Sequence, residues 1–268
     1  MSLSGKKPNN IKIMKTFPES KLAHKYLNGF QGLEIGGSIH NPFGLKTRNV
    51  DYSDSDKTTF KKEEYDMHGD FLPVDIVAFG DDIPVSDESQ DFVVSSHVLE
   101  HFPDPIKALK EWYRIIKKGG YIFMIVPHME RTFDKDEKRT TLQELLARHN
   151  NVEYDKEPSM SGHYSHWITE DIIELVKNID LNWQVVDFQD ADDKVGNGFT
   201  VVIKKMKPDL KIQKRIGNRI ARLKNYRAFV QKSPKIARRF FEMTGNMKNN
   251  FRRGGAIGVC RRIIAKNS

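Results

Sequence analysis

Histidines gather where apolar runs of this sequence end, and histidine is the side chain best matched to proton transfer at neutral pH. His97 and His101 follow one such run, His128 follows the next, and His163 and His166 come further along the chain. Because ligands bind at the edge where parallel strands end, we expect an imidazole there to accept a proton. His128 is our first candidate for a catalytic base and His166 the second, with a packed or solvent-facing histidine as the alternative.

A second group of residues has the pattern of a nucleoside site. A short apolar run stops at Gly36 and Gly37, and a second short run ends on the acid Asp51. Glycine lets a ligand approach the main chain, and an acid at this separation suits ribose hydroxyls. The pattern indicates an adenosine site, with a tight structural turn as the alternative. A pyrophosphate ligand is disfavoured because Ser38 and His40 stand where further glycines would be expected.

Alternating strands and helices must position these residues. Strands are expected at residues 33–35, 49–50, 74–79, 91–96, 121–126, 183–188 and 198–204, and helices at 17–26, 105–116 and 169–177. The two glycines at 119–120 are expected to end the second helix, and the last two strands flank a segment with hairpin chemistry. The sequence thus predicts an α/β fold with a mostly parallel seven-stranded sheet that ends in an antiparallel hairpin. A charged segment at 53–70 and about forty residues after Pro127 lack a clear pattern, and we expect the latter to form an insertion or a lid.

Composition restricts the class of protein. The 268 residues suit one sizeable domain with an appendage, and the single cysteine, Cys260, excludes a disulfide scaffold and a cysteine-based zinc site. No apolar run reaches the length needed to span a bilayer, and the first ten residues lack a hydrophobic signal region, so we expect a cytoplasmic protein. The histidine spacing is not that of a metal site, so no metal is expected.

Charge separates the C-terminal part of the chain from the rest. Residues 205–268 hold 19 Lys and Arg against 2 Asp and Glu, whereas residues 1–204 hold 25 against 34. Ile212, Ile216 and Ile220 recur at helical spacing among basic residues, which predicts a cationic amphipathic tail. We expect this tail to lie at the anionic inner face of a membrane, with packing on a partner or on the main domain as the alternative. Nucleic acid is disfavoured because no aromatic residues are interleaved for stacking.

Three stretches together resemble the class I S-adenosylmethionine-dependent methyltransferases. They are Leu33-Glu-Ile-Gly-Gly-Ser38 with Asp51, the run 82–101, and the run 108–120. The pieces 126–128, 131–134 and 163–167 are similar to a bacterial subgroup of the type 11-like methyltransferases that is associated with polysaccharide biosynthesis. The resemblance implies a Rossmann-like methyltransferase fold over residues 29–204, with residues 1–28 as a lead-in, residues 205–268 as a basic helical tail, and S-adenosylmethionine as the cofactor.

The resemblance also implies roles for residues around the cofactor. Gly36 and Gly37 would lie under its methionine part, Glu34 would contact its ammonium, and Asp51 would hold its ribose hydroxyls. Where the fourth strand ends, Ser96 and His97 would pass beside the sulfonium.

The adenine contact departs from the family pattern. The family places an acid after the third strand, and Phe79 occupies the matching position here. Either Asp81 or Asp82 replaces that acid, or Phe79 stacks on the adenine ring. On the acceptor side, the sequence predicts that Arg131, Asp134 and His163 bind a hydroxyl-rich or anionic substrate, with a charged surface loop as the alternative.

These observations lead to an expected activity. Methyl transfer from a sulfonium is an in-line displacement, so the protein must align nucleophile, methyl and sulfur, and a hydroxyl nucleophile also needs a base. We expect O-methylation of a sugar hydroxyl in a surface polysaccharide or a lipid-linked precursor. The alternatives are a small-molecule or lipid methyltransferase and a non-catalytic scaffold with the same fold.

Overall fold

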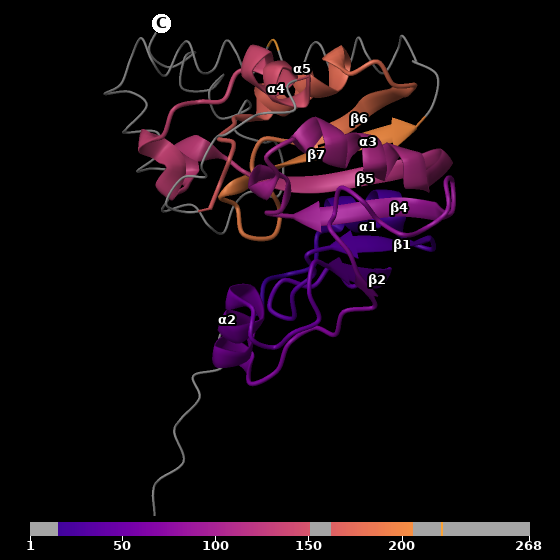
Figure 1. The fold of residues 1–268 in the computed structure, drawn as a ribbon, viewed down its shortest axis with the longest axis vertical. Coiled ribbons are helices and arrows are strands. Elements are labelled where there is room, and N and C mark those ends of the chain that lie inside the picture. Colours follow the sequence, from indigo (N-terminus) through magenta and orange to yellow (C-terminus); the bar gives the residue numbers. More distant parts are fainter. Residues whose placement is uncertain (1–15, 151–161, 206–220, 222–268) are drawn as a thin grey trace, which may run out of the picture. The chain divides into compact units, whose positions relative to one another are not determined.

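The computed structural model describes residues 16–150, 162–205 and 221 (Figure 1). The chain divides into two units, residues 1–216 and 217–268, and the fold described below belongs to the first. The amphipathic helix expected in the basic tail and the lead-in before residue 16 lie outside the described residues.

A seven-stranded sheet forms the centre of the first unit. Its order is β3 (Ile76–Val77), β2 (Lys46–Asp51), β1 (Gln31–Ile35), β4 (Gln90–Ser96), β5 (Ile116–Pro127), β7 (Gly198–Lys205) and β6 (Trp183–Gln189). The first five strands pair in parallel, and β7 runs antiparallel to both β5 and β6. The α/β fold, with its parallel sheet and C-terminal antiparallel hairpin, is confirmed. Because β1, β2 and β4 are parallel, the residues after Ile35, Asp51 and Ser96 meet at one edge of the sheet.

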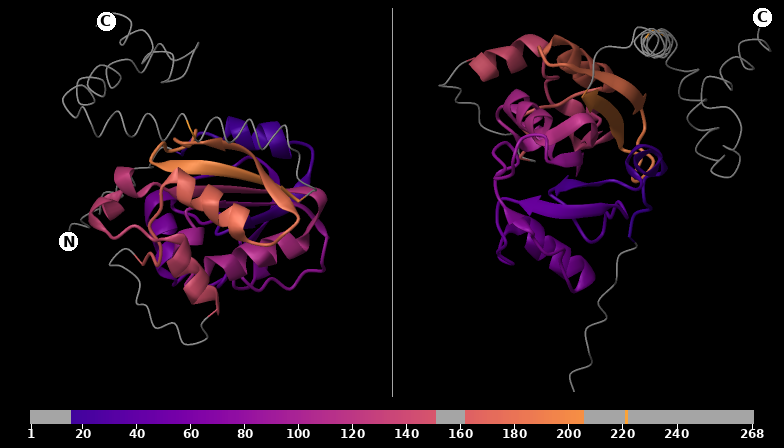
Figure 2. Two further views of the ribbon diagram at one scale, coloured as in Figure 1. Left: turned by 90° about the horizontal axis from the view of Figure 1, so that it is seen from above. Right: turned by 90° about the vertical axis from the view of Figure 1, so that its right-hand side faces the viewer.

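Helices cover both faces of the sheet. The α-helices are α1 (Lys21–Leu27), α2 (Thr59–His68), α3 (Pro105–Ile115), α4 (Leu142–Asn150) and α5 (Thr169–Asn178), and the 3-10 helices are η1 (Leu99–His101), η2 (Met129–Arg131) and η3 (Phe133–Asp136). Helix α1 lies on one face, and α3, α4 and α5 lie on the other (Figure 2). On the α1 face, Ala23 and Leu27 pack with Phe92 and Phe123 of the sheet in one buried cluster. No helix of the described ranges is long and apolar enough to cross a membrane.

Helix α3 begins as its sequence predicts but ends earlier. The Asp104 side chain accepts a hydrogen bond from the Lys107 amide (3.0 Å), and the fully buried Trp112 donates from Nε1 to the Gly80 carbonyl (2.8 Å). The helix ends at Ile115, and the expected stop at residues 119–120 is wrong because these glycines lie inside β5. Ile116 is fully buried and pairs with Gln90 of β4. Burial of its side chain and this strand pairing stabilise Ile116 as the first residue of β5.

Other differences concern segments with a weak apolar pattern. The charged segment 53–70 contains α2, which the Thr58 side chain caps and Gly69 ends with φ +74°. The strand expected over 74–79 is reduced to two residues, and the first helix begins at Lys21 rather than at 17. The segment after Pro127 contains η2, η3 and α4.

The connection between β6 and β7 is built on Asp192. Its carboxylate accepts hydrogen bonds of 2.7–3.0 Å from the backbone amides of Lys194, Val195, Gly196 and Gly198. One side chain therefore organises the predicted hairpin turn and fixes the position of Lys194.

Candidate functional site

A glycine loop, residues 36–40, follows β1 at the carboxyl edge of the sheet. Gly36 has φ +64° and donates its amide to the Val50 carbonyl (2.9 Å), while the Gly37 amide donates to Asn49 Oδ1 (3.0 Å). A Cβ atom on Gly37 would lie 2.9 Å from Asn49 Oδ1, and one on Gly36 would lie 2.9 Å from the Val98 side chain. Both positions therefore require glycine, because the chain passes closely over its neighbours.

Helix α2 is hydrogen-bonded to the glycine loop through one of its side chains. The buried Glu64 carboxylate accepts hydrogen bonds from Ser38 Oγ (2.9 Å) and from the Ile39 amide. The equally buried Lys61 amine lies 3.2 Å from Glu64 and 3.8 Å from the Asp51 carboxylate. Burial raises the pKa of Asp51, and the nearby Lys61 charge works against that rise. Sequence reasoning missed Lys61 and Glu64 because charged residues usually mark a solvent-facing helix surface.

Glu34 is the predicted ammonium contact and lies at the end of β1. Its side chain is buried, accepts a hydrogen bond from Thr47 Oγ1 (3.1 Å), and has its pKa raised by burial to about 7. The attraction of Lys194 lowers that pKa in part. Lys194, which sequence reasoning also missed, donates to the carbonyls of Pro18 (3.0 Å) and Pro42, and burial lowers its own pKa.

The predicted adenine side lies after β3. The Phe79 ring is 68% exposed, and the Asp81 carboxylate already pairs with the Lys107 amine at 2.9 Å. The Asp82 amide donates to the Phe79 carbonyl (3.0 Å), which closes a turn. Of the predicted contacts, the Phe79 ring is therefore exposed, while Asp81 has an ionic partner.

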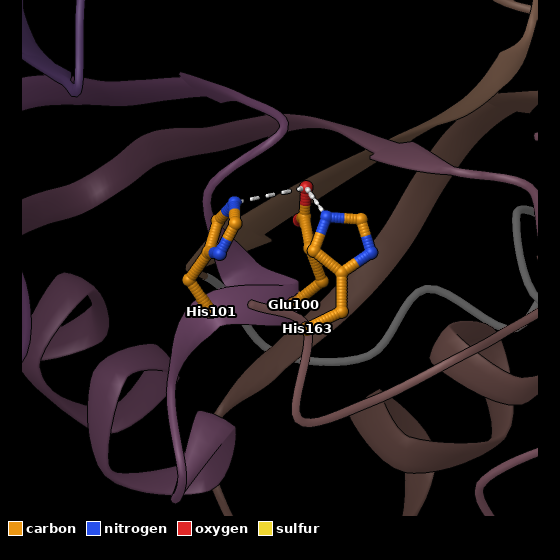
Figure 3. A group of neighbouring side chains, drawn as sticks. All are labelled: Glu100, His101 and His163. Carbon is orange, nitrogen blue, oxygen red and sulfur yellow. Dashed lines mark ion pairs between the residues drawn. The ribbon is translucent and has the colours of Figure 1, made fainter. Parts of the chain in front are cut away.

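A buried carboxylate lies at the centre of the histidines. Glu100, on η1, is fully buried, and neither of its carboxyl oxygens has a hydrogen-bond partner among the described residues. His97 Nδ1, His101 Nε2 and His163 Nε2 lie 3.9, 3.9 and 4.0 Å from Glu100 Oε1. Figure 3 shows the rings of His101 and His163 turned toward this oxygen. Burial raises the pKa of Glu100 to about 8.

A second buried carboxylate, Asp134, contacts two histidines of this region. His163 Nδ1 is hydrogen-bonded to Asp134 Oδ2 at 2.9 Å, and His166 Nε2 lies 3.7 Å from Asp134 Oδ1. The Tyr164 amide donates to the Glu100 carbonyl (2.8 Å), which ties this segment to η1. We call these side chains the histidine cluster: His97, Glu100, His101, Asp134, His163 and His166. It joins the predicted base His166 to the predicted substrate residues Asp134 and His163.

His97 occupies a special position in this cluster. It directly follows β4, has φ +56°, and donates its amide to the Ile125 carbonyl (2.9 Å). Burial lowers the pKa of its imidazole, and its Nε2 atom has no hydrogen-bond partner among the described residues. A non-glycine residue with positive φ is uncommon, and such backbones occur often at functional sites.

His128 and Arg131 share the carboxylate of Asp190. The His128 ring is 1% exposed, and its Nδ1 accepts a hydrogen bond from the Glu130 amide (3.3 Å) at the start of η2. Its Nε2 lies 4.0 Å from Asp190, whose carboxylate also binds the Arg131 guanidinium at 2.9 Å. His128 further forms a backbone bridge with Trp167, so this residue helps to hold the segment that carries His163 and His166.

A cavity of about 490 Å³ lies at the opposite edge of the sheet, where the parallel strands begin. Gln31, Lys46, Asp91 and Lys117 are among its lining residues. The glycine loop and the histidine cluster lie at the other end of these strands. We therefore place the candidate functional site at those two groups and not at this cavity.

Comparison with known proteins finds a match to one domain family. A family model described as a methyltransferase domain matches residues 37–124, about a third of the chain. An uncharacterized protein of Methanocaldococcus jannaschii is 34% identical over 97 residues, which are 35% of this chain and 43% of that protein, so the match spans less than half of the relative. S-adenosylmethionine-dependent methyltransferases of known structure from Methanosarcina mazei and Aquifex aeolicus are 16% and 17% identical. They cover 73% and 75% of this chain and 100% and 94% of their own, with TM-scores of 0.45 and 0.43. These distant likenesses carry no argument about the reaction.

The domain match agrees with the geometry of the sheet edge. It confirms S-adenosylmethionine as the cofactor, and the matched residues run from Gly37 through Asp51 to the histidines after β4. Ser95 Oγ and Asn41 Oδ1 are buried at this edge without a hydrogen-bond partner among the described residues. With the carboxylate of Glu34, they offer acceptors that suit an ammonium and hydroxyl groups, so the residues present fit the cofactor.

Proposed function

We propose that this methyltransferase domain transfers the methyl group to a hydroxyl oxygen of a sugar in a surface polysaccharide or in a lipid-linked precursor of one. The proposal depends on one observation above all. Strand β4 ends in Ser96 at the cofactor edge and continues directly into His97 and the histidine cluster. A base and a polar acceptor surface would thus lie beside the transferred methyl group.

The residues around the glycine loop would bind and orient the cofactor. Gly36 and Gly37 allow close approach to the main chain, Glu34 binds the ammonium, and Asp51 binds the ribose hydroxyls. The bound cofactor supplies an electrophilic methyl group on a sulfonium. Orientation is the main catalytic contribution in such a displacement, and it requires the acceptor oxygen in line with the methyl carbon and the sulfur.

An imidazole of the histidine cluster would take the proton of the acceptor hydroxyl. Of the histidines in the cluster we favour His97, because it adjoins Ser96 and its Nε2 has no hydrogen-bond partner among the described residues. This choice differs from His128 and His166, the bases favoured from the sequence. His128 supports η2 and is 1% exposed, whereas His166 lies deeper in the cluster beside Asp134.

Two features support a glycan as the acceptor. Two imidazoles of the cluster, His97 and His101, are partly exposed, and their ring nitrogens can exchange hydrogen bonds with the hydroxyls of a sugar. Residues 205–268, outside the described part apart from residues 205 and 221, carry 19 Lys and Arg against 2 Asp and Glu. Such a segment would hold the enzyme near an anionic membrane surface, where lipid-linked sugars are assembled.

The test is transfer of a radioactive methyl group. The full chain is incubated with labelled S-adenosylmethionine and with lipid-linked oligosaccharide, free oligosaccharide or sugar-free phospholipid, and the product is hydrolysed to locate the label. We expect label on a sugar oxygen, and a loss of roughly 100-fold or more in kcat for His97→Gln. His24→Gln, on α1, is the matched control and should keep full activity. Label in the sugar-free phospholipid, or unchanged activity of His97→Gln, would contradict the proposal.

A further inference from the structure

We propose that Glu100, His101 and His163 bind one divalent transition-metal ion of the zinc class and leave a coordination position open. The sequence spacing predicted no metal site, because His163 lies about sixty residues beyond the other two side chains. The fold brings them together, as Figure 3 shows. One ligand atom from each of the three residues lies within 4.8 Å of the others.

The distances fit an ion at the centre of the group. His101 Nε2 and His163 Nε2 lie 3.9 and 4.0 Å from Glu100 Oε1. Ligand bonds of about 2.0–2.2 Å place neighbouring ligand atoms roughly 3.4 Å apart at a tetrahedral angle. Closure by about half an ångström along the two Glu100 distances, and by at most about 1.4 Å between the two imidazole nitrogens, would therefore complete three bonds to a zinc-sized ion.

The ring orientations match those of metal-bound histidines. His101 Nδ1 lies 3.1 Å from the Gly162 carbonyl, which can only accept, so Nδ1 carries the proton and Nε2 presents a lone pair toward Glu100. His163 repeats the arrangement, with Nδ1 at 2.9 Å from the Asp134 carboxylate and Nε2 on the side of Glu100. A ligand histidine usually donates its other ring N–H to a carbonyl or a carboxylate in this way.

The buried carboxyl group of Glu100 lacks a partner from the rest of the described chain. Its two oxygens are fully buried and receive no hydrogen bond from any other described residue, although the Glu100 backbone amide lies close enough to lower the pKa of the carboxyl group in part. The His101 lone pair faces one of these oxygens. A buried carboxylate is costly unless it is paired, protonated or bound to a metal ion. A cation between the carboxylate and the imidazoles would pair with Glu100 Oε1 and with the lone pairs of both imidazoles.

A second group, Asp134, His163 and His166, also has ligand-type atoms close together. There, however, His163 Nδ1 and Asp134 Oδ2 are 2.9 Å apart, a direct hydrogen bond. We therefore assign Asp134 to the support of His163 and not to the ion. Two imidazoles and one carboxylate, with one coordination position left open, are typical ligands of a catalytic zinc ion. Magnesium instead prefers oxygen ligands alone.

The role of the ion rests on the proposed function, although its binding does not. A cation at this place would attract the acceptor hydroxyl and lower the pKa of that hydroxyl. The hydroxyl would then lose its proton to the His97 imidazole, its oxygen would form the bond to the methyl carbon, and the carbon–sulfur bond would break with its electron pair on sulfur. S-adenosylhomocysteine and a methyl ether are the products.

The test is a titration of the metal-free full chain with Co²⁺, followed by its visible d–d absorption, and displacement by Zn²⁺. We expect one bound equivalent with the strong absorption of a four- or five-coordinate ion. Asp134→Asn should weaken binding roughly 10- to 100-fold, and His101→Ala should weaken it further. His101 is partly exposed, so that variant is expected to fold, which circular dichroism checks.

Matched variants make the result decisive. His24→Ala removes a histidine outside the cluster and should bind Co²⁺ as the unaltered chain does. Absence of the absorption, equal binding by His101→Ala, or a loss in His166→Ala without one in His101→Ala would overturn the assignment. No cofactor or acceptor is present in the titration, so failure here leaves methyl transfer untouched, and failure of methyl transfer leaves the metal result standing.

Discussion

Replacement of Glu34 by glutamine should change how the stability of the protein depends on pH. The carboxyl group has an ordinary pKa of 4.5, and burial raises it to about 7 in the folded chain. Between these values the folded protein holds a proton that the unfolded chain has lost, so stability falls as pH rises from 4.5 to about 7 and is constant above. At about 1.4 kcal/mol per pKa unit, the full effect is about 3 kcal/mol.

Urea unfolding in the absence of cofactor measures this effect. The amide oxygen that Glu34→Gln introduces can still accept the hydrogen bond that Thr47 Oγ1 donates, so the variant keeps the local contact. We expect Glu34→Gln to gain about 3 kcal/mol relative to the unaltered protein between about pH 4.5 and pH 8. Comparison at each pH cancels the titration of all other groups.

A matched carboxylate provides the control. Glu63 is exposed on α2, and Glu63→Gln should have the same free energy of unfolding as the unaltered protein. If the difference in free energy of unfolding between Glu34→Gln and the unaltered protein does not change with pH, the idea that β1 ends in a buried, readily protonated acid is refuted. If the ammonium of S-adenosylmethionine pairs with the Glu34 carboxylate as proposed, the cofactor should stabilise the unaltered protein above about pH 7 more than it stabilises Glu34→Gln.

Other predictions concern the elements that hold the site. Gly37→Ala places a methyl group 2.9 Å from Asn49 Oδ1, so it should cost about 1–3 kcal/mol of stability and reduce cofactor affinity in calorimetry. Asp192→Ala removes the acceptor of four backbone amides and should cost about 3 kcal/mol in urea unfolding. Trp112→Ala removes a fully buried side chain and should cost about 3–5 kcal/mol, and a change in melting temperature within error would contradict the packing described for α3.

The sequence predicted those parts of the fold in which apolar residues recur at regular helical or strand spacing. The stripe of α3, with Leu109 and Trp112, and the alternation of strands with helices were sufficient for the sheet and its C-terminal hairpin. Helix α2 was missed because its buried residues are Lys61 and Glu64, which a hydrophobic pattern does not detect. These two residues pair with each other, and Glu64 also binds the glycine loop, a tertiary contact that local sequence does not contain.

The sequence singled out the glycine loop, Asp51 and the histidines of the candidate site, but it did not single out Glu100, around which the histidines lie. The glycine loop and Asp51 follow from local patterns, since a strand, a turn and an acid are close in sequence. Glu100 was missed as the centre of the cluster, although His97, Glu100 and His101 have the spacing of neighbours on one helical turn. His163 joins them from a distant segment, which the Tyr164 amide ties to the Glu100 carbonyl and the Gly162 carbonyl ties to His101 Nδ1.

Cofactor binding by the glycine loop and Asp51 is the central claim, and isothermal titration of the full chain with S-adenosylmethionine tests it most directly. We predict micromolar binding that Asp51→Ala abolishes and that Asp54→Ala, an exposed acid three residues on, preserves. Absence of binding by the unaltered chain, or equal binding by Asp51→Ala, would contradict the account.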